Sequence, residues 1–245
     1  MSKLPDVLWL NTSPSFRCFD RPLLRYLSTQ VTIAQWKYVQ SQDDASLLDV
    51  AVLLLHDYLK SNAQPVHLIG HSTGGLLGLL YARQYPERVR SLTLMAVGVH
   101  PALDWQAYYY VHRLYLPYSR QLILTQMVDN LFGYQDKYAT QDLVKILEQD
   151  LDNSVSPHSL FQRVSVPSGG VPVPLMICGS KDDIFVNSNE LLGWQAWLKE
   201  GDRLWSCPQG RHFFHYFHPQ QVGRIILKFW KSLRQSDSLC LSLRL

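Results

Sequence analysis

The chain has 245 residues, 47% of them hydrophobic, which is enough to bury the core of one α/β domain. Its net charge of +3, with 18% charged residues scattered along the sequence, gives no reason to expect a nucleic-acid partner. No apolar run is long enough for a membrane span, and the first residues do not resemble a signal peptide. The four cysteines follow no metal or disulfide spacing, so we expect a reduced, cytoplasmic protein.

Short apolar runs alternate with helical patterns along most of the chain, which predicts βαβ units and a parallel sheet. We expect strands at residues 6–10, 31–36, 65–69, 91–97, 173–178 and 203–206. We expect helices at residues 19–27, 44–60, 76–85, 104–116, 120–131, 141–151, 188–199 and 219–233. The pattern predicts an α/β fold with a mostly parallel sheet of roughly six strands and helices on both faces.

The alternation breaks between residues 99 and 171, where helical patterns occur without convincing strands. We therefore expect a core formed by residues 1–98 and 172–235, a helical lid inserted at 99–171, and a flexible tail at 236–245. Nine of the 29 aromatic residues lie between residues 105 and 138 of this insertion. Two of them, Trp105 and Tyr109, belong to a stripe at helical spacing. Such residues either pack the insertion onto the core or line an apolar substrate pocket.

Ser72 lies in the sequence Gly-His-Ser-Thr-Gly-Gly, between a predicted buried strand and a predicted helix. A serine in this position sits on a sharp turn whose backbone tolerates almost no bulk. Gly70 and Gly74 supply the room because they have no Cβ. The N-terminus of the following helix then points toward the group that the serine attacks. We predict that Ser72 is a nucleophile.

A serine nucleophile needs a base, and the base needs an acceptor that orients it. Two acids, Asp182 and Asp183, follow a predicted strand, and His212 follows the last one. Polar groups of this kind collect at the carboxyl ends of parallel strands. His215 and His218 continue a spacing of three from His212, but such positions rotate off one helix face and no carboxylate accompanies them. We therefore expect no metal site.

With these motifs the chain resembles the α/β-hydrolase family over nearly its whole length. The resemblance rests on Tyr85-Pro86-Glu87-Arg88-Val89 before a strand, on the G-x-x-D segment 179–182, on a glycine-flanked histidine before an aromatic residue, and on the helical insertion. It implies that Asp182, rather than its neighbour Asp183, is the acid and that His212 is the base. It also implies an oxyanion hole formed by the N–H groups of Thr73 and Ser13, although Asn11-Thr12 replaces the family's His-Gly.

The resemblance implies a serine hydrolase that cleaves an ester, thioester or related acyl substrate with an apolar portion, without a metal or organic cofactor. Three alternatives stay open. The same triad serves lyases and carbon–carbon bond hydrolases, including menaquinone-pathway enzymes and hydroxynitrile lyases. A carrier-protein ester hydrolase of the biotin pathway would fit if a basic rim surrounded the lid. The third alternative is a non-catalytic receptor for a small ligand. The intact triad argues against this alternative, whereas the replacement of His-Gly by Asn11-Thr12 favours it.

Overall fold

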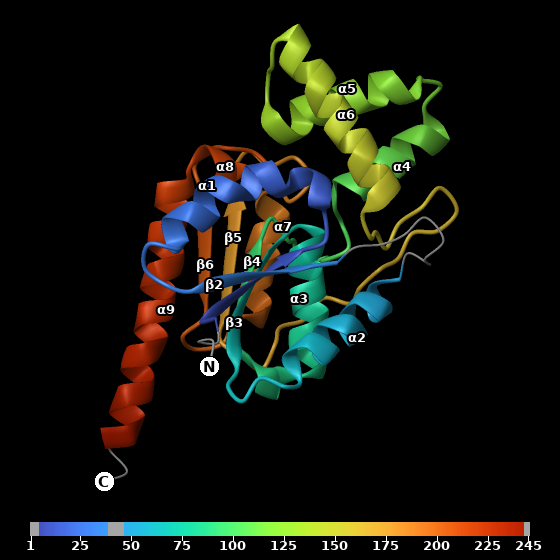
Figure 1. Ribbon diagram of the computed structural model, residues 1–245. Coiled ribbons are helices and arrows are strands. Elements are labelled where there is room, and N and C mark those ends of the chain that lie inside the picture. The colour runs from blue at the N-terminus through green and yellow to red at the C-terminus, as the bar shows by residue number, and fades with distance from the viewer. Residues whose placement is uncertain (1–4, 39–46, 243–245) are drawn as a thin grey trace.

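The computed structural model describes residues 5–38 and 47–242 and contains one six-stranded sheet (Figure 1). All pairs of neighbouring strands are parallel, and the strand order is β2-β1-β3-β4-β5-β6. The strands are β1 (Val7–Asn11), β2 (Ile33–Lys37), β3 (Val66–His71), β4 (Val89–Met95), β5 (Leu175–Ser180) and β6 (Arg203–Cys207). The predicted α/β fold with a parallel sheet of six strands is confirmed.

Helices cover both faces of the sheet, α1 and α9 on one side and α2, α3 and α7 on the other (Figure 1). Three further helices, α4 to α6, gather at one end of the molecule, and the short α8 lies between α1 and α9. The bounds are α1 (Arg17–Leu27), α2 (Leu48–Leu59), α3 (Thr73–Gln84), α4 (Trp105–Tyr115), α5 (Arg120–Phe132), α6 (Lys137–Asn153), α7 (Ser188–Leu192), α8 (Phe214–Phe217) and α9 (Pro219–Ser242). None of the helices in the described part of the chain is both long and apolar enough to cross a bilayer.

The first strand shows how the sequence builds the two-sided core. Every residue of β1 is buried, as expected for a parallel strand covered on both faces. Leu8 and Leu10 belong to the cluster under α2 and α3, whereas Val7 and Trp9 belong to the cluster under α1 and α9. Successive side chains of a strand point to opposite faces, so one short apolar run serves both clusters.

The helical insertion is joined to the rest of the protein by a third apolar cluster. This cluster combines residues of α4, α5 and α6 with Phe16, Phe19 and Phe213 of the main domain. The rings of Phe132 and Phe213 are stacked with centroids 4.5 Å apart, and that of Phe19 lies 4.9 Å from Phe132. Aromatic contacts of this kind stabilise an interface beyond simple burial of area. The insertion is therefore docked on the core by the residues around Phe213.

Several element boundaries differ from those predicted. Helix α9 continues to Ser242 rather than ending at 233, and the last three residues lie outside the described part. The flexible tail at 236–245 stays a prediction. This stretch has no glycine or proline, so its sequence contains no stop signal. The expected start of a helix at residues 44–46 also lies outside the described residues, and α2 begins at Leu48.

The start of α3 offers a test of the packing beneath the turn at Ser72. A Cβ at Gly74 would overlap the carbonyl oxygen of Leu10, which belongs to rigid backbone. A Cβ at Gly78 would instead lie 3.0 Å from the terminal methyl of Leu92 and 3.1 Å from that of Leu10. We expect Gly74→Ala to lower the free energy of unfolding by about 2 kcal/mol or more.

The matched variant is Gly78→Ala in the same helix. For Gly78→Ala we expect the free energy of unfolding to change by less than about 1 kcal/mol. The better helix propensity of alanine offsets the cost of moving two flexible side chains slightly. Urea unfolding of both variants measures the difference. Equal losses would show that the contact with Leu10 does not constrain the turn.

Candidate active site

Ser72 occupies the strained turn between β3 and α3. Its φ of 49° and ψ of −123° lie in a region that residues with a side chain rarely adopt. The turn is tight, since a Cβ at Gly70 would overlap the backbone of Gly74 and Gly75. The N–H of Ser72 donates to the carbonyl oxygen of Met95 at 2.9 Å and fixes the turn on β4. The predicted strand, sharp turn and helix are therefore present around this serine.

Helix α3 begins directly after Ser72, with Thr73 as its first residue. The first N–H groups of a helix have no partner within the helix and carry a partial positive charge. A small cavity of about 20 Å³ lies beside Ser72 and is bordered by Asn11, the last residue of β1, and by Thr12 and Ser13 after it. Its volume is close to that of one water molecule, and thus of a single oxygen atom.

His212 is fully buried and pairs with Asp183, whose carboxylate oxygen Oδ2 lies 2.9 Å from Nδ1 of the imidazole. Because a carboxylate only accepts hydrogen bonds, Nδ1 carries the proton. The other carboxylate oxygen of Asp183 accepts from the backbone N–H groups of Phe185 and Val186. Nε2 of His212 is buried and has no hydrogen-bond partner among the described residues. The pair thus presents an oriented imidazole with one nitrogen available.

The prediction that Asp182 orients His212 is wrong. Its carboxylate accepts instead from the Ser180 hydroxyl at 2.6 Å and from the backbone N–H groups of Gly210 and Arg211 at 3.2 and 2.8 Å. Burial acts to raise the pKa of Asp182, but these hydrogen bonds outweigh it and the pKa is lowered. Asp182 therefore fixes the loop that carries His212, while its neighbour Asp183 contacts the imidazole itself.

Two further histidines lie beside His212. Nε2 of His71 lies 2.9 Å from the carbonyl oxygen of His212, and the ring centroids are 4.8 Å apart. Burial, followed by the proximity of His215 and His212, holds the pKa of His71 well below its usual range. His215 is fully buried and faces Asp20 at 3.2 Å. His212 and His215 therefore face different acids, and the described residues hold no cluster that could bind a metal.

The loop after β1 departs from the prediction for the oxyanion hole. The backbone N–H of Ser13 donates to Oδ1 of Asn11 at 3.1 Å, so this donor is already used within the loop. An asparagine side chain commonly bonds the backbone two residues further on. The structure thus contradicts the expectation that Ser13 offers a free N–H, whereas Thr73 keeps its place at the helix N-terminus.

Two buried acids of the insertion contact the residues predicted for the oxyanion hole. Asp104 accepts from the hydroxyl of Thr73 at 3.3 Å and caps α4 through the N–H of Ala107. Asp150, from α6, accepts a hydrogen bond from the side chain of Ser13. It also accepts from the amide of Gln106 at 3.0 Å. Neither acid is predicted from the sequence as part of the site. The sequence does place Asp104 just before a helical pattern, a position typical of an N-cap.

Trp105 and Tyr109, predicted to bind substrate, lie in the apolar cluster that docks the insertion. They are 2% and 5% exposed, and the ring of Trp105 lies 6.1 Å from that of Phe16. The packing alternative therefore describes their contacts in this structure. Their contact with a substrate stays a prediction.

Asp150 yields a pH-dependent prediction. Burial raises the pKa of Asp150 to about 7, although hydrogen bonds from Ser154, Ser13 and Gln106 act to lower it. The folded pKa lies above the unfolded value of about 3.9, so Asp150 stabilises the fold below about pH 4. That stability is lost as the pH rises toward 7. Relative to Asp150→Asn, which does not ionise, the wild type should lose roughly 2–3 kcal/mol of unfolding free energy between about pH 4.5 and 7.5.

Urea unfolding of both proteins across this pH range measures the effect. Asp142→Asn provides the control, because Asp142 lies on the same helix but is exposed and bonded only to Lys145. A difference between wild type and Asp150→Asn that stays constant with pH would contradict the assignment.

Comparisons with known proteins agree with this architecture. Residues 49–126 match the model of the alpha/beta hydrolase fold family. The uncharacterized protein alr2406 of Nostoc sp. is 49% identical over 231 residues, which cover 94% of this chain and 92% of that protein. A 2-hydroxy-6-oxononadienedioate/2-hydroxy-6-oxononatrienedioate hydrolase of Comamonas testosteroni is 26% identical over 182 residues, covering 68% and 63%.

Among solved structures, naproxen esterase of Bacillus subtilis has a TM-score of 0.69 at 15% identity, covering 94% of this chain and 85% of that chain. A likeness at this identity concerns the fold alone. The family model adds sequence evidence across the turn at Ser72. Together with the parallel sheet and the order of serine, acid and histidine along the chain, these matches show that the chain belongs to the α/β-hydrolase family of enzymes.

Proposed function

We propose that this protein is a serine hydrolase that cleaves an ester, thioester or related acyl substrate through an acyl-enzyme intermediate. The observation that carries the proposal is the pair of His212 and Asp183, which leaves Nε2 of the imidazole without a hydrogen-bond partner among the described residues. The ring centroid of His212 lies 4.8 Å from that of His71, the residue before Ser72 in the chain. The substrate is an acyl compound with an apolar portion, and its reacting carbonyl carbon is attacked by the hydroxyl of Ser72.

In the proposed reaction, Nε2 of His212 removes the proton of Ser72 as its oxygen bonds to the carbonyl carbon. Asp183 keeps the proton on Nδ1 and stabilises the imidazolium that forms. His212 then donates its proton to the leaving group, and the acyl group stays on Ser72. A water molecule, deprotonated by His212, attacks this acyl-enzyme and releases the acid.

Negative charge develops on the carbonyl oxygen in the transition state, and the N–H of Thr73 at the start of α3 is the donor that we assign to it. The cavity of about 20 Å³ beside Ser72 has room for that oxygen. Ser13 has given its N–H to Asn11, so any second donor requires that the loop rearranges. Losing one donor costs about 3 kcal/mol of barrier, so we expect slow turnover of simple esters.

A carbon–carbon bond hydrolase is the second candidate. The observation that favours it is the 26% identity with the hydrolase of Comamonas testosteroni, whose name describes a dienedioate or trienedioate substrate. Both reactions use a serine, a histidine and an acid, so the pair of His212 and Asp183 is compatible with either. Testing esters and vinylogous diketone acids in parallel as substrates separates the two candidates. An esterase breaks a carbon–oxygen bond, and the second candidate breaks a carbon–carbon bond.

The first test asks whether Ser72 is activated. A fluorophosphonate probe should label the wild type at Ser72, as peptide mapping reveals, and Ser72→Ala should neither be labelled nor hydrolyse p-nitrophenyl esters. His212→Ala should lower kcat/KM by at least about a thousandfold, since the groups act as one unit. Unchanged ester turnover in Ser72→Ala would reject the mechanism.

A second test compares the two neighbouring acids. Asp183→Asn should lower kcat by roughly 10²–10⁴, because the imidazole loses its orienting carboxylate. Asp182→Asn should lower kcat by less than about tenfold, because Asp182 holds the loop and does not contact the imidazole. The Tm of this variant should fall, because the loop loses hydrogen bonds. The opposite ranking in kcat would reject Asp183 as the acid of the triad.

A further inference from the structure

Exposed cations gather on the outer sides of α1 and α9. We call these residues the cationic face: Arg17, Arg21 and Arg25 of α1, with Arg224, Lys228 and Lys231 of α9. At about 100° per residue, each set spans an arc of less than about 90° on its helix. The two helices cover the same side of the sheet and pack against each other where the ring of Tyr26 lies on Gly223. Six cations far apart in the sequence therefore share one side of the molecule.

None of these six cations is paired with an acid among the described residues. The one acid of α1 is Asp20, which is buried and faces His215. From Pro219 to Gln235, helix α9 contains no acid at all. The net charge of the whole chain is only +3, so the remaining surface balances this face. Unbalanced charge of this extent favours an anionic partner.

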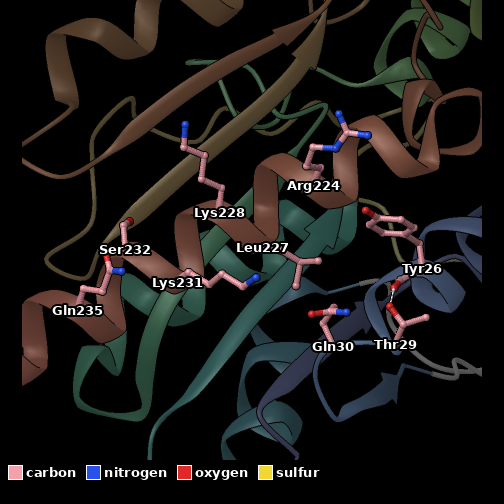
Figure 2. Close-up of a pocket in the computed structure, with 9 residues that line it drawn as sticks. All are labelled: Tyr26, Thr29, Gln30, Arg224, Leu227, Lys228, Lys231, Ser232 and Gln235. Atoms are coloured by element: carbon pink, nitrogen blue, oxygen red, sulfur yellow. Dashed lines mark hydrogen bonds between the residues drawn. The ribbon is translucent and has the colours of Figure 1, made fainter.

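A groove of about 690 Å³ lies between the end of α1 and α9 (Figure 2). Figure 2 shows the three cations of α9 on one side, with Tyr26, Thr29 and Gln30 across from them. Leu227 lies between the two sides. Hydroxyl and amide groups beside cations match an acidic headgroup, which carries both negative charge and hydrogen-bonding oxygens.

Exposed aromatic rings lie on α8, a neighbouring helix that packs against both α1 and α9. Tyr216 and Phe217 are 38% and 40% exposed, and the ring of Tyr216 lies 5.3 Å from that of Phe19 on α1. Aromatic rings next to cations favour the region between lipid headgroups and acyl chains. An acidic protein partner would instead favour a central apolar anchor pocket ringed by polar groups. The arrangement on α1, α8 and α9 therefore fits a bilayer better than a protein.

We propose that the cationic face docks this protein on the surface of a bilayer that contains anionic lipids. The protein lies on such a surface through α1 and α9, and headgroups enter the groove beside Lys228 and Lys231. Each cation near an anionic bilayer raises the partition coefficient about fivefold, and this attraction is screened within a Debye length. The proposal concerns binding alone and does not rest on the proposed hydrolase activity.

Co-sedimentation with vesicles tests this proposal. The full chain should bind vesicles of phosphatidylcholine with about 30% phosphatidylglycerol at about 0.05 M salt, and should be released at about 0.5 M salt. The triple variant Arg224→Gln, Lys228→Gln and Lys231→Gln should bind roughly a hundredfold more weakly than wild type. Circular dichroism and thermal unfolding establish that this variant is folded.

The matched control removes three exposed cations from other elements, Lys37→Gln, Lys137→Gln and Arg163→Gln, with the same change in net charge. It should bind the anionic vesicles within about threefold of wild type. Equal losses in the two triple variants would overturn the proposal, because net charge alone would then explain binding. Equally strong binding to vesicles of pure phosphatidylcholine would also overturn the proposal. So would binding to soluble polyglutamate without binding to either kind of vesicle.

Discussion

The contact between the start of α3 and the end of β1 is the constraint on which the candidate site depends. Gly74 lies against the carbonyl oxygen of Leu10, and the same turn brings Gly70 onto Gly74. With both ends fixed, the chain passes from β3 to α3 only with Ser72 at positive φ. The strain is supported by the burial of β1, β3 and α3 in one apolar core. The position of the serine is thus set by backbone packing rather than by its own side chain.

The insertion contacts both sides of this turn, which couples its docking to the geometry of the site. Asp104 bonds the side chain of Thr73, and Asp150 bonds that of Ser13. Both acids are buried, so each needs its polar partners to offset the cost of desolvation. Movement of α4 or α6 away from the core would leave these acids without Thr73 and Ser13. The docking of the insertion is therefore coupled to Thr73, the proposed oxyanion donor, and to the loop that carries Ser13.

The sequence was sufficient for placing the six strands along the chain and for the turn at Ser72, because apolar periodicity and paired glycines are local signals. It was insufficient for choosing between Asp182 and Asp183. The side chains of these two neighbours make different contacts. The Ser180 hydroxyl and the backbone N–H of Gly210 bond Asp182 and hold it away from His212, and these groups come together only in the folded loop. The bond from the Ser13 N–H to Asn11 is likewise a matter of loop geometry. The cations of α1 and α9 looked scattered because about 200 residues separate them in the chain.

The three neighbouring histidines differ in what the surrounding groups allow them to do. His215 pairs with Asp20 and His212 with Asp183, while Nε2 of His71 faces the carbonyl oxygen of His212. Burial, followed by the proximity of His215 and His212, keeps the pKa of His71 low, so His71 stays neutral. A second positive charge there would oppose the imidazolium that His212 must become in the proposed reaction. His71 thus orients the backbone of His212 through a hydrogen bond in which His71 itself is neutral. The positive charge of the proposed reaction forms on His212, where the carboxylate of Asp183 balances it.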